Sequence, residues 1–401
     1  MGKQELNNFR FASKYPDLGD GPVPVAPYIS ADYFERERET VFRRHWLNLG
    51  RTDAIPNAGD YFVKDLAVLG VSVLVIRGDD GQVRAFHNVC QHRGNLLTYQ
   101  EHGCRKALTC SFHGWVYDSR GQLVDVPDQA EFYRLDRDKL RLREFACDTW
   151  NGFVFIHPQE TPPQDLRTYL GQLAANLQDY PFDQMELVGS WRATVNCNWK
   201  AFTDAFQEGY HVAMVHRRSI PDAFTGGETA SCILDYARLD GLHRALSCPA
   251  NPSRNPKPAE ALAFKAAATL TQGAAGMDSL MPGLNPGGMA SWGFDINVFF
   301  PNFFIDPANG WYFTYNFWPE AVNRTYWEVR MYMMKAPNAA VTVASEYSKV
   351  LLRDAVLEDL STLEAGQRGM ESGGIRELQF SDQEIACRHQ YQVVDRLVRQ
   401  G

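Results

Sequence analysis

The sequence has no long apolar run, no excess of positive charge and no secretion signal. Its longest nearly unbroken apolar stretch, LAVLGVSVLVI at residues 66–76, is far shorter than the roughly 20 residues that cross a bilayer. Its β-branched residues predict a single buried strand instead. Acidic residues outnumber basic ones by 48 to 40, and this net charge of -8 argues against a nucleic-acid or membrane-surface partner. We therefore expect a cytoplasmic protein.

Cysteine and histidine are scarce, with 8 and 10 copies among 401 residues. Without a secretion signal, cysteines in a chain of this size indicate reduced thiols and a metal site rather than a disulfide framework. The Gly-x-Gly-x-x-Gly fingerprint of dinucleotide-binding proteins is also missing. The few cysteines and histidines that cluster are therefore the first residues to consider for function.

The length of the chain exceeds what one hydrophobic core usually covers, so we expect two domains. Short alternating runs between residues 55 and 157 are separated by GDDG and SRGQ, which predict antiparallel hairpins. Before them, Ser30 is placed to cap an amphipathic helix. After them, three prolines at residues 158, 162 and 163 indicate a linker. We predict an N-terminal helical segment packed on the second domain (1–45), a β domain (46–158) and a second domain (159–401).

The second domain mixes helices and strands. Strands are predicted over residues 294–305, 310–318 and 326–334, and helices over 341–368 and 381–400. A further helix is expected around residues 198–216. The Gly-rich stretch 271–290 is too long for a routine connection and is predicted to be mobile or functional. The fold class is α+β, with an antiparallel β domain followed by a helix-covered antiparallel sheet.

One metal-binding pattern is well defined. Cys90-x-His92 is followed after 17 residues by Cys110-x-x-His113, so two short chelating pairs can lie on neighbouring hairpin loops. Two Cys and two His form either a structural zinc site or a Rieske [2Fe-2S] cluster. The Cys-x-His arm and the β context favour the cluster. His102 and Cys104 lie between the arms and are interpreted as loop residues.

A second pattern, EGYHVAMVH, combines Glu208, His211 and His216. Positions three apart share one face of a helix, whereas positions five apart differ by about 140°. His216 can therefore join His211 only where the helix unwinds or bulges, a distortion that is common at functional sites. The two histidines are candidate ligands of a second metal.

CQHRG and CSFHGWVYD together resemble the signature of the Rieske non-haem iron oxygenases, in their terminal oxygenase alpha subunits. The NWK segment at 198–200 and the YHVAMVH segment at 210–216 also resemble that family. The resemblance implies that Cys90 and Cys110 bind one iron of a [2Fe-2S] cluster, and that His92 and His113 bind the other.

The same resemblance implies a mononuclear Fe(II) in the second domain, held by His211, His216 and a carboxylate of a C-terminal helix. Asp359 matches the family pattern best, and Glu358 and Asp354 are the alternatives. Glu208 stands where the family usually has Asp, a carboxylate that bridges an iron ligand of one subunit to a cluster ligand of the next. Asp204 is expected to line the pocket or support this bridge.

The resemblance further implies partners. Electrons come from NAD(P)H through a separate flavin reductase, with or without a ferredoxin, and the missing nucleotide fingerprint agrees with a reductase on another chain. An α3 homotrimer brings the cluster of one subunit to the iron of its neighbour. We expect no nucleic-acid partner and no membrane partner.

The substrate is expected to be O2 together with a hydrophobic small molecule, first of all an aromatic one. We predict a pocket formed by Ala205, Phe206, Phe299 and Asn302. The predicted reaction is monooxygenation, as hydroxylation or oxidative N- or O-dealkylation. Alternatives are cis-dihydroxylation of an aromatic ring, a quaternary-amine monooxygenase, a Rieske electron carrier without oxygenase activity and a zinc-containing binding protein.

Overall fold

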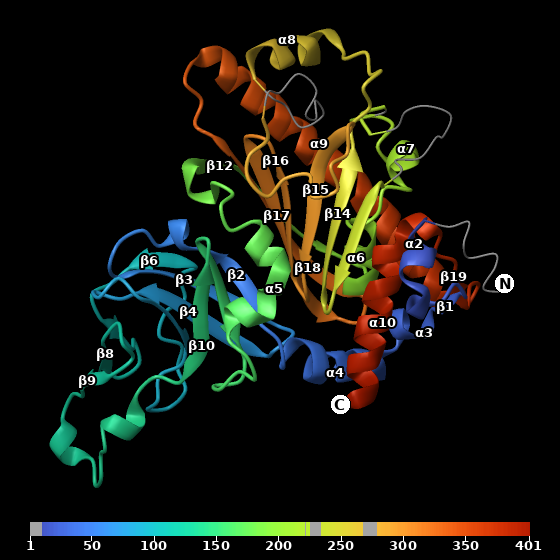
Figure 1. Cartoon of the computed structure of the whole chain (residues 1–401). Coiled ribbons are helices and arrows are strands. Elements are labelled where there is room, and N and C mark those ends of the chain that lie inside the picture. The colour runs from blue at the N-terminus through green and yellow to red at the C-terminus, as the bar shows by residue number, and fades with distance from the viewer. Residues whose placement is uncertain (1–9, 221, 225–233, 268–278) are drawn as a thin grey trace. The chain divides into compact units, whose positions relative to one another are not determined.

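The computed structural model of the chain describes residues 10–220, 222–224, 234–267 and 279–401. It divides into two compact units, which are described separately (Figure 1). The small unit is Arg38–Tyr169, and the large unit combines the chain up to Glu37 with Leu170–Gly401. The predicted domain boundaries, after residues 45 and 158, fall inside the small unit and stay predictions. Of the predicted Gly-rich loop, residues 271–278 lie outside the described residues.

The small unit is built on a seven-stranded antiparallel sheet, as the hairpin pattern predicted. Its strand order is β2 (Leu47–Arg51), β11 (Phe153–His157), β10 (Glu144–Trp150), β5 (Val83–His87), β4 (Val71–Arg77), β3 (Asp60–Leu66) and β6 (His102–Cys104). The prediction of one buried strand over residues 66–76 is wrong, because β3 ends at Leu66 and β4 begins at Val71. Between them the chain turns at Gly70, whose φ of 69° suits a residue without a Cβ.

A second, three-stranded sheet of the small unit carries part of the metal-binding pattern. It consists of β7 (Leu108–Thr109), β8 (Val116–Tyr117) and β9 (Leu123–Asp125). Between the two sheets lies a core cluster that contains Cys90, Cys110, Trp115 and Tyr117. The two cysteines of the pattern are therefore part of the hydrophobic interior of this unit.

The large unit contains a second seven-stranded antiparallel sheet. Its strand order is β12 (Met185–Val195), β18 (Arg324–Met334), β17 (Trp311–Ala321), β16 (Phe303–Ala308), β15 (Trp292–Phe299), β14 (His243–Pro249) and β13 (Tyr236–Asp240). Helix α6 (Trp199–Ala205) packs on β17 and β18. Phe202 and the following Phe206 meet the rings of Phe317 and Trp327 there, at centroid distances of 5.1–5.9 Å. Aromatic residues thus form the core between the sheet and this helix, and the α+β fold class is confirmed.

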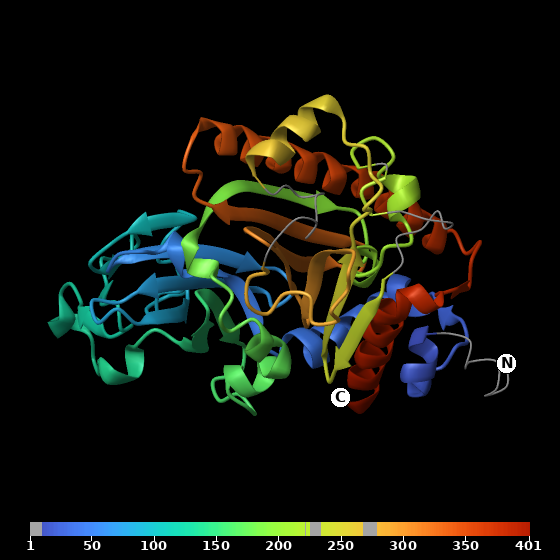
Figure 2. The ribbon, with the colours of Figure 1, turned by 45° about the horizontal axis from the view of Figure 1, so that its top comes forward.

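Two long helices complete the large unit. Helix α9 (Ala339–Glu371) runs across the strands on the side where α6 and α7 (Val212–Val215) lie, and Figure 2 shows its course. Helix α10 (Ile385–Gln400) contacts α6 and β13. Both were predicted, with ends within a few residues of those observed. Helix α8 (Pro258–Ala266), which contacts α9, falls in a Pro- and Gly-rich region where no helix was predicted.

The N-terminal segment of the large unit is fixed by a buried ion pair. Helix α4 (Ala31–Glu37) begins after Ser30, whose Oγ accepts a hydrogen bond from the backbone N–H of Tyr33 at 3.2 Å. At its end, Glu37 lies 2.5 Å from Lys200 Nζ and accepts a hydrogen bond of 3.0 Å from Trp199 Nε1. Both charged side chains are fully buried, so the pair ties this segment to the start of α6.

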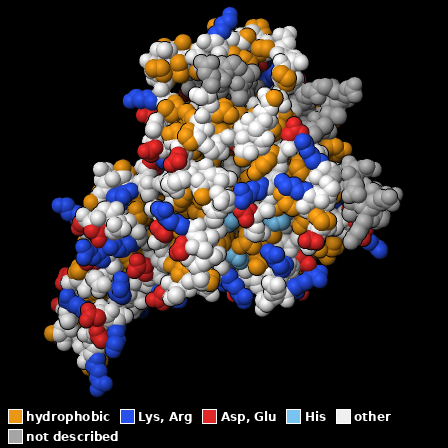
Figure 3. Space-filling model, viewed as in Figure 1, with side chains coloured by type: hydrophobic (Ala, Val, Ile, Leu, Met, Phe, Trp, Pro, Cys, Tyr) orange, Lys and Arg blue, Asp and Glu red, His pale blue; other side chains and the backbone are white. Residues whose placement is uncertain are grey.

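The surface carries charges of both signs. On the face drawn in Figure 3, blue basic and red acidic side chains are interspersed over both the upper and the lower part of the view. Among the described residues, no helix is long and apolar enough to cross a bilayer.

Candidate metal centres and their cavity

The two Cys/His arms of the small unit have the same backbone geometry. Gly94 N donates to Cys90 O and Gly114 N donates to Cys110 O, each at 3.0 Å. Each cysteine N–H also donates, at 2.8 Å, to the carbonyl five residues later. Both glycines have positive φ, 77° and 74°, which a residue with a Cβ rarely adopts. The local sequence therefore folds each arm into a tight loop that presents a Cys and a His.

The sulfur atoms of the two arms face hydrogen-bond donors. Tyr117 accepts a hydrogen bond from Gln91 N at 3.0 Å, so its own hydroxyl proton can point to Cys90 Sγ, 3.4 Å away. Asn95 Nδ2 lies 3.7 Å from Cys110 Sγ. Such donors stabilise thiolates and tune the potential of a bound cluster. Neither Tyr117 nor Asn95 was singled out from the sequence, although Asn95 lies three residues after His92 and Tyr117 four residues after His113.

The two histidines of the arms lie side by side. The rings of His92 and His113 are 4.6 Å apart at 70°, and His92 stacks on Trp115 at 4.8 Å. His92 Nδ1 is buried and has no hydrogen-bond partner in the described chain. A buried ring nitrogen without a partner is costly unless a ligand occupies it, so these residues fit a bound iron.

The four ligands of the two arms do not form a compact group of ligand atoms in the described part of the chain. Among the described residues, the only group with three ligand atoms all within 4.8 Å of one another is formed by His211, His216 and Asp359. Four ligands of one tetrahedral zinc would lie at least that close. Two thiols and two imidazoles are the ligand set of a two-iron Rieske cluster, which the arms therefore favour. His102 and Cys104, expected in a loop, form the short edge strand β6 and are exposed.

In the large unit, the helix that was expected through residues 198–216 is broken. Helix α6 ends at Ala205, and α7 covers only Val212–Val215. His211 lies just before α7 and His216 just after it. Their Nε2 atoms are 3.2 Å apart, so the two side chains meet although they flank the same short helix. The backbone between the two histidines is itself helical, because Val215 N donates to His211 O and His216 N donates to Val212 O. The break therefore lies before His211, and the distortion predicted between His211 and His216 is not found there.

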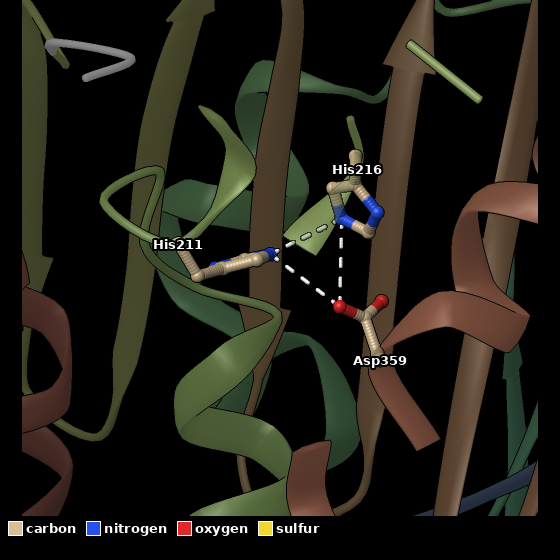
Figure 4. Close-up of side chains that lie close together, drawn as sticks. All are labelled: His211, His216 and Asp359. Atoms are coloured by element: carbon tan, nitrogen blue, oxygen red, sulfur yellow. Dashed lines mark hydrogen bonds and ion pairs between the residues drawn. The ribbon is translucent and has the colours of Figure 1, made fainter. Parts of the chain in front are cut away.

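Helix α9 brings Asp359 to these two histidines, as Figure 4 shows. Asp359 Oδ1 lies 3.6 Å from His211 Nε2 and 3.4 Å from His216 Nε2. Divalent transition-metal ions bind imidazole nitrogen and carboxylate oxygen at about 2.0–2.2 Å, and ligands at 90–120° are then about 3.0–3.7 Å apart. The three atoms have this spacing, so the donor set fits one metal ion.

A carboxylate contacts the other ring nitrogen of each histidine. Glu208 contacts His211 Nδ1, and Glu358 Oε2 lies 3.1 Å from His216 Nδ1. Such contacts fix each imidazole with its proton on Nδ1 and turn Nε2 toward the metal. Glu358 also accepts a hydrogen bond of 2.7 Å from Ser219 and lies outside the triad, and Asp354 pairs with Arg353. Of the three carboxylates considered from the sequence, only Asp359 points at both histidines.

Burial sets the charge state of the triad. It raises the pKa of Asp359 to about 7 and lowers the pKa of His216 to about 4. His216 is therefore neutral at neutral pH, the form that binds a metal. A bound cation reverses the effect of burial on Asp359 and favours its ionised form.

Asp204 does not line the cavity beside the triad, so that part of its prediction is wrong. Its carboxylate accepts hydrogen bonds from Tyr28 at 3.1 Å, Gln207 at 3.1 Å and Gln390 at 2.8 Å. These residues belong to the N-terminal segment, the end of α6 and α10. Asp204 points away from the cavity, whereas the next two residues, Ala205 and Phe206, line it.

The cavity beside the triad is mostly apolar. It encloses about 680 Å³ including its mouth, and His211, His216 and Asp359 form part of its wall. The predicted Ala205 and Phe206 line it, but Phe299 and Asn302 do not. Side chains alternate along a strand, so Phe299 points to the opposite face from Phe294 and Ile296, which do line the cavity. Two of the four predicted pocket residues therefore do not line the cavity: strand parity turns Phe299 away, and Asn302 lies in the turn between β15 and β16.

Two sequence models match adjacent parts of the chain. The model described as the Rieske [2Fe-2S] domain matches residues 45–146. The model described as the ring hydroxylating alpha subunit (catalytic domain) matches residues 182–400, more than half of the chain. The first match covers both Cys/His arms, and the second covers the triad.

Characterised relatives are similar over about half of the chain. The large oxygenase component of the naphthalene 1,2-dioxygenase system of Pseudomonas aeruginosa is 37% identical over 197 residues, which are 47% of this chain and 43% of that protein. The carnitine monooxygenase oxygenase subunit of Escherichia coli K12 is 31% identical over 197 residues, 48% of this chain and 52% of that protein. The chain thus matches about half the length of these relatives.

Solved structures share the fold over nearly the whole chain. A naphthalene 1,2-dioxygenase from Rhodococcus sp. bound to indole superposes with a TM-score of 0.75 at 19% identity, covering 99% of this chain and 98% of that one. A quaternary ammonium Rieske monooxygenase gives the same TM-score at 18% identity, covering 95% and 96%. At these low sequence identities, the similarity to the two solved structures shows a shared fold and nothing more.

Proposed function

Because the chain belongs to the family of ring-hydroxylating alpha subunits that carry a Rieske [2Fe-2S] domain, we propose that it is the terminal oxygenase component of a multicomponent system. The observation that carries this proposal is the triad of His211, His216 and Asp359 in the wall of an apolar cavity. A metal site that opens into a cavity of this kind suits chemistry on a bound hydrophobic molecule.

We propose that Cys90 and Cys110 hold one iron of the cluster and that His92 and His113 hold the other. The triad would hold a mononuclear iron(II). When bound, the cluster supplies single electrons and the iron(II) activates dioxygen beside the substrate. The chain's own contribution is to keep His216 neutral by burial, to turn the Nε2 atoms of His211 and His216 toward the metal through the carboxylates behind them, and to exclude water from the apolar cavity.

Electron supply is proposed to depend on other chains. We propose a flavin reductase that takes electrons from NAD(P)H, with or without a ferredoxin, and an α3 homotrimer of this chain. Within the trimer, Glu208 would connect His211 to a cluster-binding histidine of the neighbouring subunit. Support for this role is the contact between the Glu208 carboxylate and His211 Nδ1, which is the iron-side half of such a link.

The proposed reaction is monooxygenation of a hydrophobic, aromatic small molecule, by hydroxylation or oxidative dealkylation. Glu208 in place of the family's usual Asp supports this choice over dihydroxylation, because the sequence resembles the branch of quaternary-amine oxygenases at this position. The aromatic side chains Phe206, Phe294, Phe313 and Tyr315 in the cavity wall support a flat apolar substrate. Ring cis-dihydroxylation is the alternative reaction of the same site.

Turnover under isotopically labelled dioxygen tests the proposal. The purified chain, reconstituted with iron and a flavin reductase, is given NADH, 18O2 and naphthalene, indole or L-carnitine in turn, and products are read by mass spectrometry. One labelled oxygen atom in a product supports monooxygenation, whereas two on adjacent ring carbons establish dihydroxylation instead.

The His211→Ala variant provides the control. It should lack the mononuclear iron and form no labelled product, while the visible spectrum of the cluster stays unchanged. A variant that still turns over would show that the triad is not the reacting centre. A colourless wild-type protein that contains zinc would instead support the binding-protein alternative.

A further inference from the structure

One carboxyl group in the wall of the cavity has no partner. Asp306 on β16 lines the cavity and is only 3% exposed. Its Oδ1 is buried and makes no hydrogen bond with any described residue. Buried polar groups in proteins are almost always paired, so an unpaired carboxyl oxygen in a binding cavity points to a partner on the ligand.

The surroundings of Asp306 on the sheet are apolar. Its partner in the register with β17 is Phe313, and Phe304 and Ala308 precede and follow it on the same face of β16. Phe304 is fully buried and Ala308 nearly so. Burial, together with the negative charge of Asp295, holds the pKa of Asp306 well above its usual range. Among the described residues, none donates a hydrogen bond to Asp306 Oδ1, although the Tyr315 phenol lies near enough for the charge of Asp306 to raise its pKa.

Asp295 on the neighbouring strand shows what a satisfied carboxyl looks like in the same sheet. It accepts hydrogen bonds from Ser247 at 2.6 Å, Trp292 at 2.8 Å and the backbone N–H of Asn285 at 2.8 Å. It is buried to the same degree as Asp306 but does not line the cavity. The fold therefore places three hydrogen-bond donors around Asp295, whereas Oδ1 of Asp306, which lines the cavity, has none.

The wall of the cavity also favours a positive charge. It contains the carboxyls of Glu208, Asp306 and Asp359, and no lysine or arginine among the described lining residues. A bound metal ion would offset the charge of Asp359, and Glu208 has His211 Nδ1 as a partner, which leaves Asp306 without one. The faces of the aromatic side chains Phe294, Phe313 and Tyr315 further favour a cation over an anion.

We propose that Asp306 is a specificity-determining residue, and that the substrate carries a protonated amine whose N–H donates to Asp306 while its apolar part fills the cavity. This inference rests on the proposed function, because it places the substrate beside the triad. An amine cation favours the ionised form of Asp306, and the resulting charge-assisted hydrogen bond satisfies the buried oxygen. The proposal narrows the substrate from any hydrophobic molecule to a hydrophobic amine.

Calorimetric binding to the anaerobic holoenzyme tests this inference without relying on turnover. The probes are 2-phenylethylamine and propylbenzene, which have nearly the same shape but differ in the amine group. We expect 2-phenylethylamine to bind at least tenfold more tightly. Trimethyl(2-phenylethyl)ammonium, which has charge but no N–H, should bind more weakly than the primary amine, as should the carbonyl compound 1-phenylpropan-2-one.

Variants assign the preference to one side chain. In Asp306→Asn and Asp306→Leu, the ratio of the two affinities should fall at least tenfold, with propylbenzene binding changed less than twofold. The matched variant Asp295→Asn should not lower the ratio, because it leaves the Asp306 carboxyl in place and only removes a neighbouring negative charge. Because both probes are measured on the same preparation, a partly unfolded variant changes the number of sites and leaves the ratio unaffected.

Several outcomes would overturn the inference. Equal or tighter binding of propylbenzene, of the quaternary ammonium probe or of 1-phenylpropan-2-one by the wild-type protein would each contradict an amine N–H at Asp306. If the ratio of the two affinities were unchanged in both Asp306 variants, another residue would be responsible for any preference for the amine. If the wild-type protein contains the mononuclear iron and consumes NADH but shows no amine preference, this inference fails alone; if the iron is missing, the proposed function fails first.

Discussion

The two candidate metal centres of this chain are encoded in different ways. The four ligands of the small unit lie between residues 90 and 113, on two loops that each close through their own backbone hydrogen bonds and a glycine with positive φ. The triad of the large unit combines His211 and His216 with Asp359, far away on α9. The ligands of the Cys/His centre thus all lie in one local segment, whereas the triad forms only when elements that are distant in the sequence pack together.

The groups behind the ligands differ as well. The thiols of the small unit face donors, the Tyr117 hydroxyl and the Asn95 amide, whereas the imidazoles of the large unit face the carboxylates Glu208 and Glu358. A thiolate is stabilised by donated hydrogen bonds, and an imidazole N–H needs an acceptor. The comparison teaches that each site is supported by the chemistry complementary to its own ligands, and the following changes test that view.

The largest effect is expected when the triad loses its carboxylate. Asp359→Ala should abolish binding of the mononuclear iron and all product formation, because two imidazoles alone are a weak site. Iron content and the visible spectrum of the cluster, measured on the same sample, check that the small unit is untouched. The matched change Glu358→Gln should lower iron affinity only about 10–100-fold, since it removes a group behind His216. Equal losses in both variants would contradict the assignment of Asp359.

A change at the contact behind His211 should affect electron supply more than metal binding. Glu208→Gln is expected to keep both metals at saturating iron but to lower reductase-driven turnover about a hundredfold, because the amide no longer provides the charged link proposed between subunits. The measurement compares the turnover number with the rate at which dithionite reduces the cluster. Full reductase-driven turnover in this variant would mean that electrons take another route.

A smaller effect is expected at the donors of the small unit. Tyr117→Phe removes the hydroxyl that lies 3.4 Å from Cys90 Sγ. Losing one such hydrogen bond, worth about 1 kcal/mol, should lower the reduction potential of the cluster by on the order of 40 mV, because the more negative, reduced cluster is stabilised less. A potentiometric titration followed by electron paramagnetic resonance measures this. Tyr133→Phe, at a fully exposed tyrosine of the same unit, is the control and should leave the potential unchanged.

The smallest expected effect concerns acid stability of the large unit. Burial, with help from Arg244 and Arg396, lowers the pKa of His389 to about 3. Since this folded-state value is below the unfolded one of about 6.5, His389 contributes stability above pH 6.5 that is lost as the pH falls toward 3. Between pH 7.5 and 5.5 the wild type should lose about 1 kcal/mol more unfolding free energy than His389→Gln, measured by urea denaturation. Parallel losses in both proteins would contradict a neutral, buried His389.

Much of the candidate site could be predicted from single residues and their spacing. The spacing of Cys90, His92, Cys110 and His113 indicated a metal site, with zinc and a [2Fe-2S] cluster as the alternatives. The five-residue interval from His211 to His216 predicted a break between them, whereas the observed break lies before His211, between α6 and α7. The prediction of the pocket was weaker. Phe299 was chosen without knowing the parity of β15, and a shift of one residue moves a side chain to the other face of a sheet. Asn302 lies beyond that strand, in the turn before β16.

The sequence by itself determined the ligand types, the two loops of the small unit and the α+β class, because these depend on neighbours within a few residues and on hydrophobic periodicity. Only the tertiary structure decided that Asp359, rather than Glu358, faces both histidines, and that Asp306 is left without a donor while Asp295 has three. Adjacent carboxylates on α9 look alike in sequence, and so do two aspartates on neighbouring strands. Their roles differ because packing between distant elements decides which carboxyl meets a metal ligand, a backbone N–H or an open cavity.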